Sequence, residues 1–158
     1  MNPIVKLNHL LAAIGTALQS PFLLVIRLFW GWQFFETGKG KLSDISRPTQ
    51  FFTHLHIPAP HACAIIVSLT ELIGGPLLFL GLATRFITPI LIFEMCIAYI
   101  TSEQEALHAL FSNPDKFLAA DPFLFLYASL IVFVFGPGRI SIDALLFKRT
   151  ASDTRPGA

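Results

Sequence analysis

The chain has 158 residues, of which 54% are hydrophobic and 13% charged, and it contains 16 phenylalanines. Its mean hydropathy of +0.66 is too high for an ordinary soluble domain of this length, so we predict a polytopic membrane protein. The formal net charge of +1 provides no basic face, which argues against nucleic acid as a partner.

The N-terminal segment, residues 1–19, has a Leu/Ala-rich run after Lys6 that superficially resembles a signal peptide. Polar residues interrupt the run, and no small-residue cleavage site follows it. Apolar residues recur on one helical stripe: Ile4, Leu7, Leu11, Ile14 and Leu18. We therefore predict an amphipathic helix over residues 1–19 that lies in the membrane interface.

Four later segments are apolar enough, or nearly so, to cross a bilayer, which takes about 20 residues. The predicted spans are 20–37, 61–83, 86–101 and 118–136. The third is short, and the last has only about fifteen apolar residues from Pro122 onward. Asp121-Pro122 is typical of a helix N-cap followed by proline, which indicates that the last helix begins there. The predicted fold is an all-α integral membrane four-helix bundle over residues 20–149, followed by a mobile polar tail over 150–158.

The number of spans and the basic residues predict the orientation. Four spans place both termini and the Thr84-Arg85 turn on one side, which holds six basic residues against four on the other side. Because basic residues near the membrane favour the cytoplasm, we predict a bacterial-type inner (plasma) membrane protein with both termini cytoplasmic.

Four ionisable side chains lie inside otherwise apolar segments: Arg27, Glu36, Glu71 and Glu94. At about 1.5 Å per residue along a helix, Arg27, Glu71 and Glu94 fall near the middle of their spans. A charge there costs from about 3 to above about 10 kcal/mol, so it is retained only when it is paired, hydrated or used. We predict that these four residues form a buried polar network, in which Arg27 pairs with Glu71 or Glu94.

Two interpretations of this network stay open. Three glutamates against one arginine leave excess negative charge, so one carboxyl is expected to be protonated or hydrated, as in a proton relay or a site for a quinone head. The network could instead be polar contacts that fix helix register. Small residues, which let helices approach closely, share a face with Arg27 (Gly31, Gly38) and with Glu71 (Ala64, Ser68, Gly75), so both faces are predicted to point inward.

Other candidate groups are weaker. Four histidines are expected on the outer side, where imidazole could bind copper, zinc or haem: His54, His56, His61 and His108. Their spacing matches no metal motif, so metal or haem binding is the less favoured reading. Cys63 and Cys96 are more consistent with structural roles than with a redox pair. Lys39 and Lys41 follow the first span and are predicted to be snorkelling lysines at a helix end.

Several motifs together resemble the DoxX-like family of small membrane proteins, over about residues 22–147. They are Arg27 with Phe29-Trp30-Gly31-Trp32, Gly40-Lys41-Leu42, Phe51-Phe52, Ile57-Pro58-Ala59-Pro60, Glu71-Leu72-Ile73-Gly74-Gly75, Gly81-Leu82-Ala83-Thr84-Arg85 and Gly136-Pro137-Gly138-Arg139-x-Ser141-x-Asp143. The resemblance implies a four-helix inner-membrane protein, in a family named after a subunit of a thiosulfate:quinone oxidoreductase. It transfers no catalytic residue to this chain.

The functional prediction is a membrane subunit of a redox system, quinone-linked, in oxidative, thiol or metal stress handling. The alternative is a non-enzymatic membrane scaffold or transport-assisting protein that binds copper or another stress ligand at the outer face. Expected partners are the lipid bilayer, membrane or periplasmic proteins, and further copies of the chain in a homo-oligomer.

Overall fold

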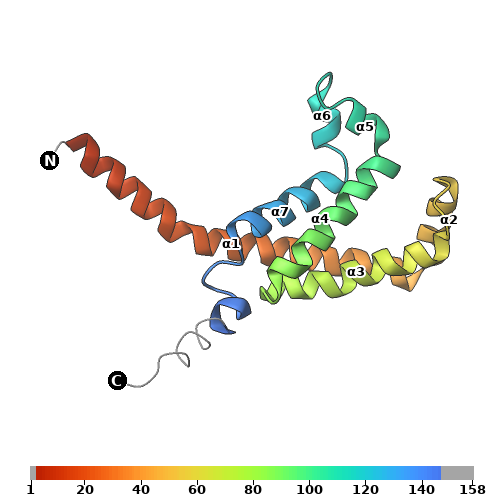
Figure 1. Cartoon of the computed structure of the whole chain (residues 1–158), viewed down its shortest axis with the longest axis horizontal. Helices are drawn as coiled ribbons and strands as arrows, with labels where there is room; N and C mark the ends of the chain where they lie inside the picture. The colour runs from red at the N-terminus through yellow and green to blue at the C-terminus, as the bar shows by residue number, and fades with distance from the viewer. Residues whose placement is uncertain (1–2, 147–158) are drawn as a thin grey trace.

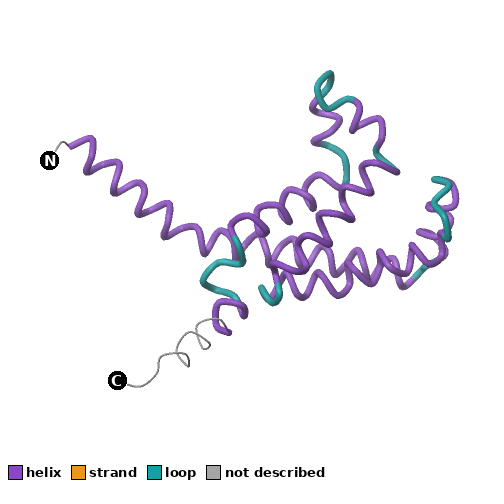
Figure 2. Tube along the Cα trace, in the orientation of Figure 1, coloured by secondary structure: helices purple, strands orange, loops and turns teal. Residues whose placement is uncertain are grey.

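The computed structural model describes residues 3–146, which form helices joined by loops and contain no strand. Figure 1 labels the helices, and Figure 2 shows the loops that join them. The helices are α1 (Pro3–Ser43), α2 (Ser46–His54), α3 (Pro60–Leu80), α4 (Thr84–Thr101), α5 (Gln104–His108), α6 (Pro114–Leu118) and α7 (Pro122–Phe135). Residues 142–146 add a further helical turn. The predicted tail, 150–158, lies outside the described residues.

Three helices, α1, α3 and α4, are long and apolar enough to cross a membrane. The prediction of an all-helical chain with helices that could span a membrane is thereby confirmed. Helix α7 is apolar but has only 14 residues. It begins at Pro122, as the Asp121-Pro122 signal indicated, and the predicted start at 118 is wrong because α6 ends at Leu118 and a bend intervenes.

The first helix does not break where the sequence predicted a boundary between residues 19 and 20. Helix α1 continues from Pro3 to Ser43 and contains Pro21. Residues 4–19, which we call the N-terminal arm, are exposed throughout. Figure 1 shows the arm leaving the bundle at an angle, and a proline within a helix is a common cause of such a bend. At 1.5 Å per residue the arm extends about 24 Å.

Helices α1 and α3 pack antiparallel, and their backbones nearly touch at three glycines: Gly31, Gly38 and Gly75. A Cβ added at Gly31 would lie 2.8 Å from the Gly75 carbonyl oxygen, and one at Gly75 would lie 2.6 Å from the Gly31 carbonyl oxygen. At Gly38 the added atom would meet the Ser68 carbonyl oxygen at 2.8 Å. All the small residues predicted to point inward are buried, so that prediction is confirmed.

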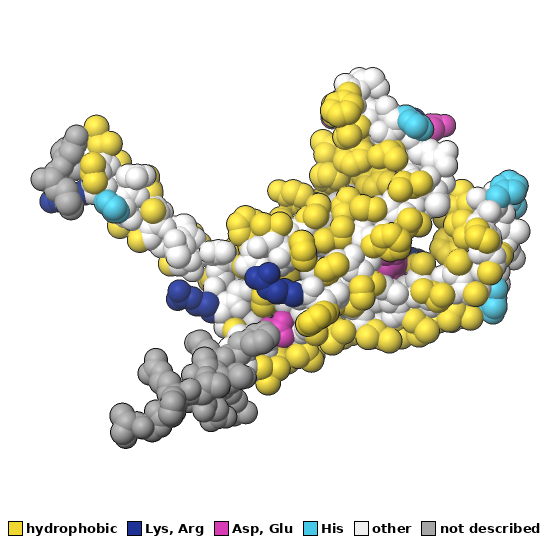
Figure 3. Space-filling model, viewed as in Figure 1, with side chains coloured by type: hydrophobic (Ala, Val, Ile, Leu, Met, Phe, Trp, Pro, Cys, Tyr) yellow, Lys and Arg dark blue, Asp and Glu magenta, His cyan; other side chains and the backbone are white. Residues whose placement is uncertain are grey.

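The hydrophobic core lies among α1, α3, α4 and α7. It consists of Phe34, Leu78, Ile87, Leu91, Met95 and Val132. Outside this core the bundle surface is itself largely hydrophobic, as Figure 3 shows for one face. A surface of this kind is suited to contact with lipid rather than with water. The α3–α4 turn and the segment after α7 lie at one end of the bundle, and α2, α5 and α6 lie toward the other (Figure 1). We call that segment, residues 136–146 with its helical turn, the C-terminal loop.

Candidate functional site

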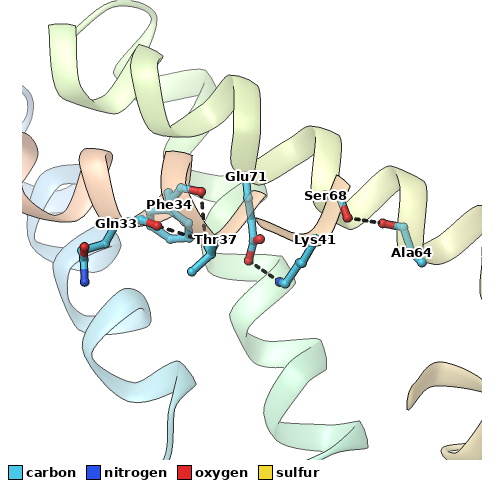
Figure 4. A network of polar contacts seen from close by, with 7 residues as sticks. All are labelled: Gln33, Phe34, Thr37, Lys41, Ala64, Ser68 and Glu71. Atoms are coloured by element: carbon cyan, nitrogen blue, oxygen red, sulfur yellow. Dashed lines mark hydrogen bonds and ion pairs between the residues drawn. The ribbon is translucent and has the colours of Figure 1, made fainter. Parts of the chain in front are cut away.

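A buried ion pair joins the end of α1 to the middle of α3. Lys41 Nζ lies 2.7 Å from Glu71 Oε1, and Figure 4 shows the two side chains pointing toward each other. The Glu71 side chain is only 4% exposed, whereas that of Lys41 is 35% exposed. Burial strengthens the attraction between the charges and makes loss of one partner costly for the other.

Helix α4 contributes a second carboxyl group to the same place. The charged neighbours of Glu94 are Glu71 and Lys41, and Glu71 is within hydrogen-bonding reach of it. Both Glu94 carboxylate oxygens and Glu71 Oε2 are buried and have no hydrogen-bond partner among the described residues. Two carboxylates beside one ammonium group would carry a net charge of −1, and one proton bound between the carboxyl groups would neutralise it. We call Lys41, Glu71 and Glu94 the carboxyl site.

Neighbouring hydroxyl groups do not hydrogen-bond to the carboxyl site. Thr37 Oγ1 donates to the carbonyl oxygens of Gln33 and Phe34, at 3.0 and 2.9 Å. Ser68 Oγ donates to the Ala64 carbonyl oxygen at 2.6 Å. Because these hydroxyls are satisfied within their own helices, Lys41 is the principal group that compensates the two carboxyls. The carboxyl site therefore has more hydrogen-bond acceptors than donors, and it can bind a proton or a hydrogen-bond donor.

Arg27 lies at the other end of the α1–α3 contact. Its side chain is fully buried, and its Nη2 donates to the Ile140 carbonyl oxygen. Its charged neighbour is Asp143. Arg27 precedes Lys41 by 14 residues, which is about 21 Å along a helix. The structure thus gives Glu71 a different partner from the predicted Arg27, because the antiparallel register sets Arg27 opposite Gly81.

The Arg27 end is a structural joint that connects the C-terminal loop to the α3–α4 turn. Asp143 Oδ1 accepts a hydrogen bond from the Ala83 N–H at 2.8 Å. Asp143 Oδ2 accepts from the Thr84 N–H at 3.0 Å and from the Thr84 hydroxyl at 2.6 Å. Burial raises the pKa of Asp143, but the hydrogen bonds from Thr84 and Ala83 outweigh it, and the net shift is downward. A carboxylate at the start of α4 also interacts favourably with the helix dipole.

Gly81 fits this joint for two reasons. Its φ of +67° favours glycine, and a Cβ there would collide with Arg27 Nη1. The Thr84-Arg85 pair, predicted as the turn, instead begins α4, and the turn consists of residues 81–83.

Glu36 lies outside the buried sites. Its side chain is 44% exposed and its carboxylate is 3.9 Å from Lys39 Nζ. The structure therefore differs from the predicted network of four residues: it places Glu71 and Glu94 together, Arg27 apart and Glu36 on the surface.

The candidate histidines are not gathered into a metal site. Within residues 3–146, no three His, Cys, Asp or Glu side chains are grouped so that they could hold a metal ion. The four histidines are exposed and occupy α2, the following loop, α3 and α5: His54, His56, His61 and His108. Cys63 and Cys96 are free cysteines.

The sequence was compared with known families, proteins and structures. The model of the DoxX family matches residues 22–104. The chain belongs to the DoxX family. A relative named "Putative oxidoreductase CatD" from Bacillus subtilis (strain 168) is 30% identical over 118 residues, which are 65% of this chain and 86% of the relative. An "Uncharacterized protein" from Haemophilus influenzae is 29% identical over 132 residues, covering 80% and 83% of the two chains. No solved structure matches significantly.

In this DoxX-family protein, the matched segment contains all three residues of the carboxyl site. Lys41 was missed as a member because it lies near a helix end, where a lysine often snorkels to the interface. A signal was available, since Arg27, Gly31, Phe34, Gly38 and Lys41 alternate by four and three residues and so share one helix face.

Proposed function

We propose that this protein is the membrane component of a redox system that uses a lipid-soluble carrier of the quinone class. The observation that carries the proposal is the carboxyl site: two carboxyl groups and one lysine enclosed by α1, α3 and α4. Reduction of a quinone to a quinol takes up two electrons and two protons. In this proposal a reduced partner, a flavoprotein or dithiol protein, supplies both electrons. The carboxyl site binds the carrier's oxygen and passes it one proton, and water supplies the second proton.

The relatives support the redox class and leave the substrate open. The name of the Bacillus relative describes that protein as a putative oxidoreductase, and similarity over 86% of its length makes the same class reasonable here. The proposed role is in the response to oxidative, thiol or metal stress. The proposed partners are membrane or periplasmic proteins, and further copies of the chain in a homo-oligomer.

The proposed topology has four spans in a bacterial inner membrane, with both termini cytoplasmic. Helices α1, α3 and α4 have the length to cross, and α7 packs against α4 as a short fourth span. The N-terminal arm is proposed to lie on the membrane surface, because its leucine-rich stripe is exposed.

The test compares Glu94→Gln and Glu71→Gln with Glu36→Gln, a matched control on the surface of α1. Purified full-length protein is titrated with a short-chain ubiquinone and a menaquinone analogue, and binding is followed by tryptophan fluorescence. The same variants are assayed in cells for survival of oxidative and thiol stress, at equal membrane levels. We expect both site variants to lose quinone binding and stress resistance, whereas Glu36→Gln retains them.

Two outcomes would contradict the proposal. If the wild-type protein binds neither quinone, the carrier class is wrong. If Glu71→Gln and Glu94→Gln retain full function at normal levels, the carboxyl site serves only helix packing, and the non-enzymatic scaffold becomes the better description.

A further inference from the structure

Two adjoining hollows lie in the angle between the N-terminal arm and α7. The first, of about 330 Å³, is almost entirely apolar and is lined by Gly15, Leu18, Gln19, Phe22, Leu23 and Phe135. The second, of about 300 Å³, is mixed, and its polar lining includes Thr16, Ser20 and Arg139. Gln19, Leu23 and Phe135 line both, so the hollows form one continuous surface that changes from apolar to polar.

The hollows lie at the end of α7, which the proposed four-span topology would put at a membrane–water boundary. Phe135 is the last residue of α7, and Gly138 of the following loop lies against Leu23, where a Cβ would be 3.4 Å from the Leu23 Cβ. Figure 1 shows the end of α7 meeting α1 where the arm leaves the bundle, at the same end as the α3–α4 turn. The apolar hollow continues along the arm to Leu18 and Gly15, and the polar hollow continues toward the C-terminal loop at Gly138 and Arg139.

Two arginines make this boundary positively charged. Arg139 lines the polar hollow, and its backbone N–H donates to Ser20 Oγ at 3.2 Å, which holds the loop against α1. Arg85 extends toward the same loop, since a Cβ at Gly136 would be 3.7 Å from its Nη2. Both arginines are exposed, and Figure 3 shows basic side chains at the base of the arm.

Among the described residues, neither arginine forms an ion pair. The sequence has no acidic residue before Glu36, and the C-terminal loop has only Asp143, which already accepts hydrogen bonds from Ala83 and Thr84. An anionic ligand is therefore favoured at the polar hollow.

We propose that this junction binds one anionic phospholipid, with an acyl chain in the apolar hollow and the phosphate at Arg139 and Arg85. A phospholipid combines the two chemistries that the continuous hollows present, at the depth where its headgroup lies. A phospholipid bound there would contact both the arm and α7 and would stabilise the angle between the arm and the rest of α1. This site is separate from the carboxyl site and does not depend on the proposed redox function.

The first test measures lipid selectivity. Full-length protein in a neutral detergent is titrated with phosphatidylglycerol, with phosphatidylcholine of the same chains, and with inorganic phosphate, and the melting temperature and lipid retention in native mass spectrometry are recorded. We expect stabilisation and retention with phosphatidylglycerol only. Arg139→Gln and Arg85→Gln should each weaken its binding about fivefold. Arg47→Gln, a matched exposed arginine at the start of α2, should not.

The second test fills the apolar hollow. An added side chain at Gly15 meets nothing within 4 Å, so Gly15→Phe should fold and occupy the space meant for the acyl chain. Gly40→Phe is the matched control, because Gly40 is equally open but lies far along α1 from the hollow. We expect Gly15→Phe alone to abolish retention of phosphatidylglycerol.

Three results would overturn the proposal. Equal stabilisation by phosphatidylcholine would show that the arginines select no headgroup. An equal effect of inorganic phosphate would identify a soluble anion as the ligand. Unchanged phosphatidylglycerol binding by the Arg139→Gln, Arg85→Gln and Gly15→Phe variants would place the lipid elsewhere.

Discussion

Two glycines in α1 should respond in opposite ways to the same substitution. At Gly38 an added methyl group would meet backbone atoms of α3, including the Ser68 carbonyl oxygen at 2.8 Å and the Glu71 carbonyl carbon at 2.9 Å. Ordinary contacts begin near about 3.4 Å, and backbone in the middle of a helix cannot move aside as a side chain can. Gly38→Ala therefore forces α1 and α3 apart by roughly half an ångström or more along their tightest contact.

The expected cost of this separation is about 3 kcal/mol, the upper part of the range for overpacked cores, because the displaced atoms are backbone and neighbouring contacts loosen as well. Gly40 lies two residues away with nothing within 4 Å of its Cβ position. Gly40→Ala should be neutral or stabilising by up to about 1 kcal/mol, since alanine favours helix more than glycine does. Reversible unfolding in mixed micelles would measure the free energy of unfolding of the Gly38→Ala and Gly40→Ala variants. Similar stabilities for the two variants would refute the close packing of α1 on α3.

Three further outcomes are expected. Lys41→Met should lower the free energy of unfolding by about 2–3 kcal/mol, less than the loss of one partner of a fully buried pair costs, because Lys41 is one-third exposed. Adding Glu71→Gln should restore at least half of that loss. A double variant no more stable than Lys41→Met would exclude the ion pair. Because the pKa of Asp143 is lowered in the folded protein, its stabilisation is fully present above the unfolded pKa of about 3.9. It should be lost as the pH falls through that value and then through the lower pKa of the folded protein, so the stability advantage over Asp143→Asn should shrink with acidification. Reporter fusions at residue 110 and at the C-terminus should report opposite sides of the membrane, and same-side signals would contradict four spans.

The sequence was sufficient to predict which helix faces point inward. The burial of a charged residue inside an apolar segment can be predicted without knowing the partner helix, because an unpaired charge is unstable in lipid whatever its neighbours are. Arg27 and Glu71 are therefore buried as predicted, together with the glycines beside them. The start of α7 could also be predicted from the Asp121-Pro122 pair, since a proline can occupy the first turn of a helix without losing a hydrogen bond.

The pairing between helices could not be predicted in the same way. Depth along each span was estimated from its ends, and an error of a few residues in a boundary moves a side chain by several ångströms. Helix α1 ends at Ser43 rather than near residue 37, so Lys41 is still inside the helix and reaches Glu71. Separately, Asp143 lies far along the chain from Arg27 and Thr84, and no helical periodicity relates such positions.

The two polar sites depend on one register between α1 and α3. Arg27 and Lys41 lie on the same face of α1, and Gly31 and Gly38 between them allow the backbone of α3 to approach. A slip of one helical turn would move Lys41 away from Glu71 and Arg27 away from the carbonyl of Ile140 at the same time. The glycine contact therefore positions the carboxyl site, and the Arg27 joint fixes the far end of the same pair of helices. Function at the carboxyl site should accordingly be sensitive to Gly38→Ala even though Gly38 has no chemistry of its own, whereas Gly40→Ala should leave it intact.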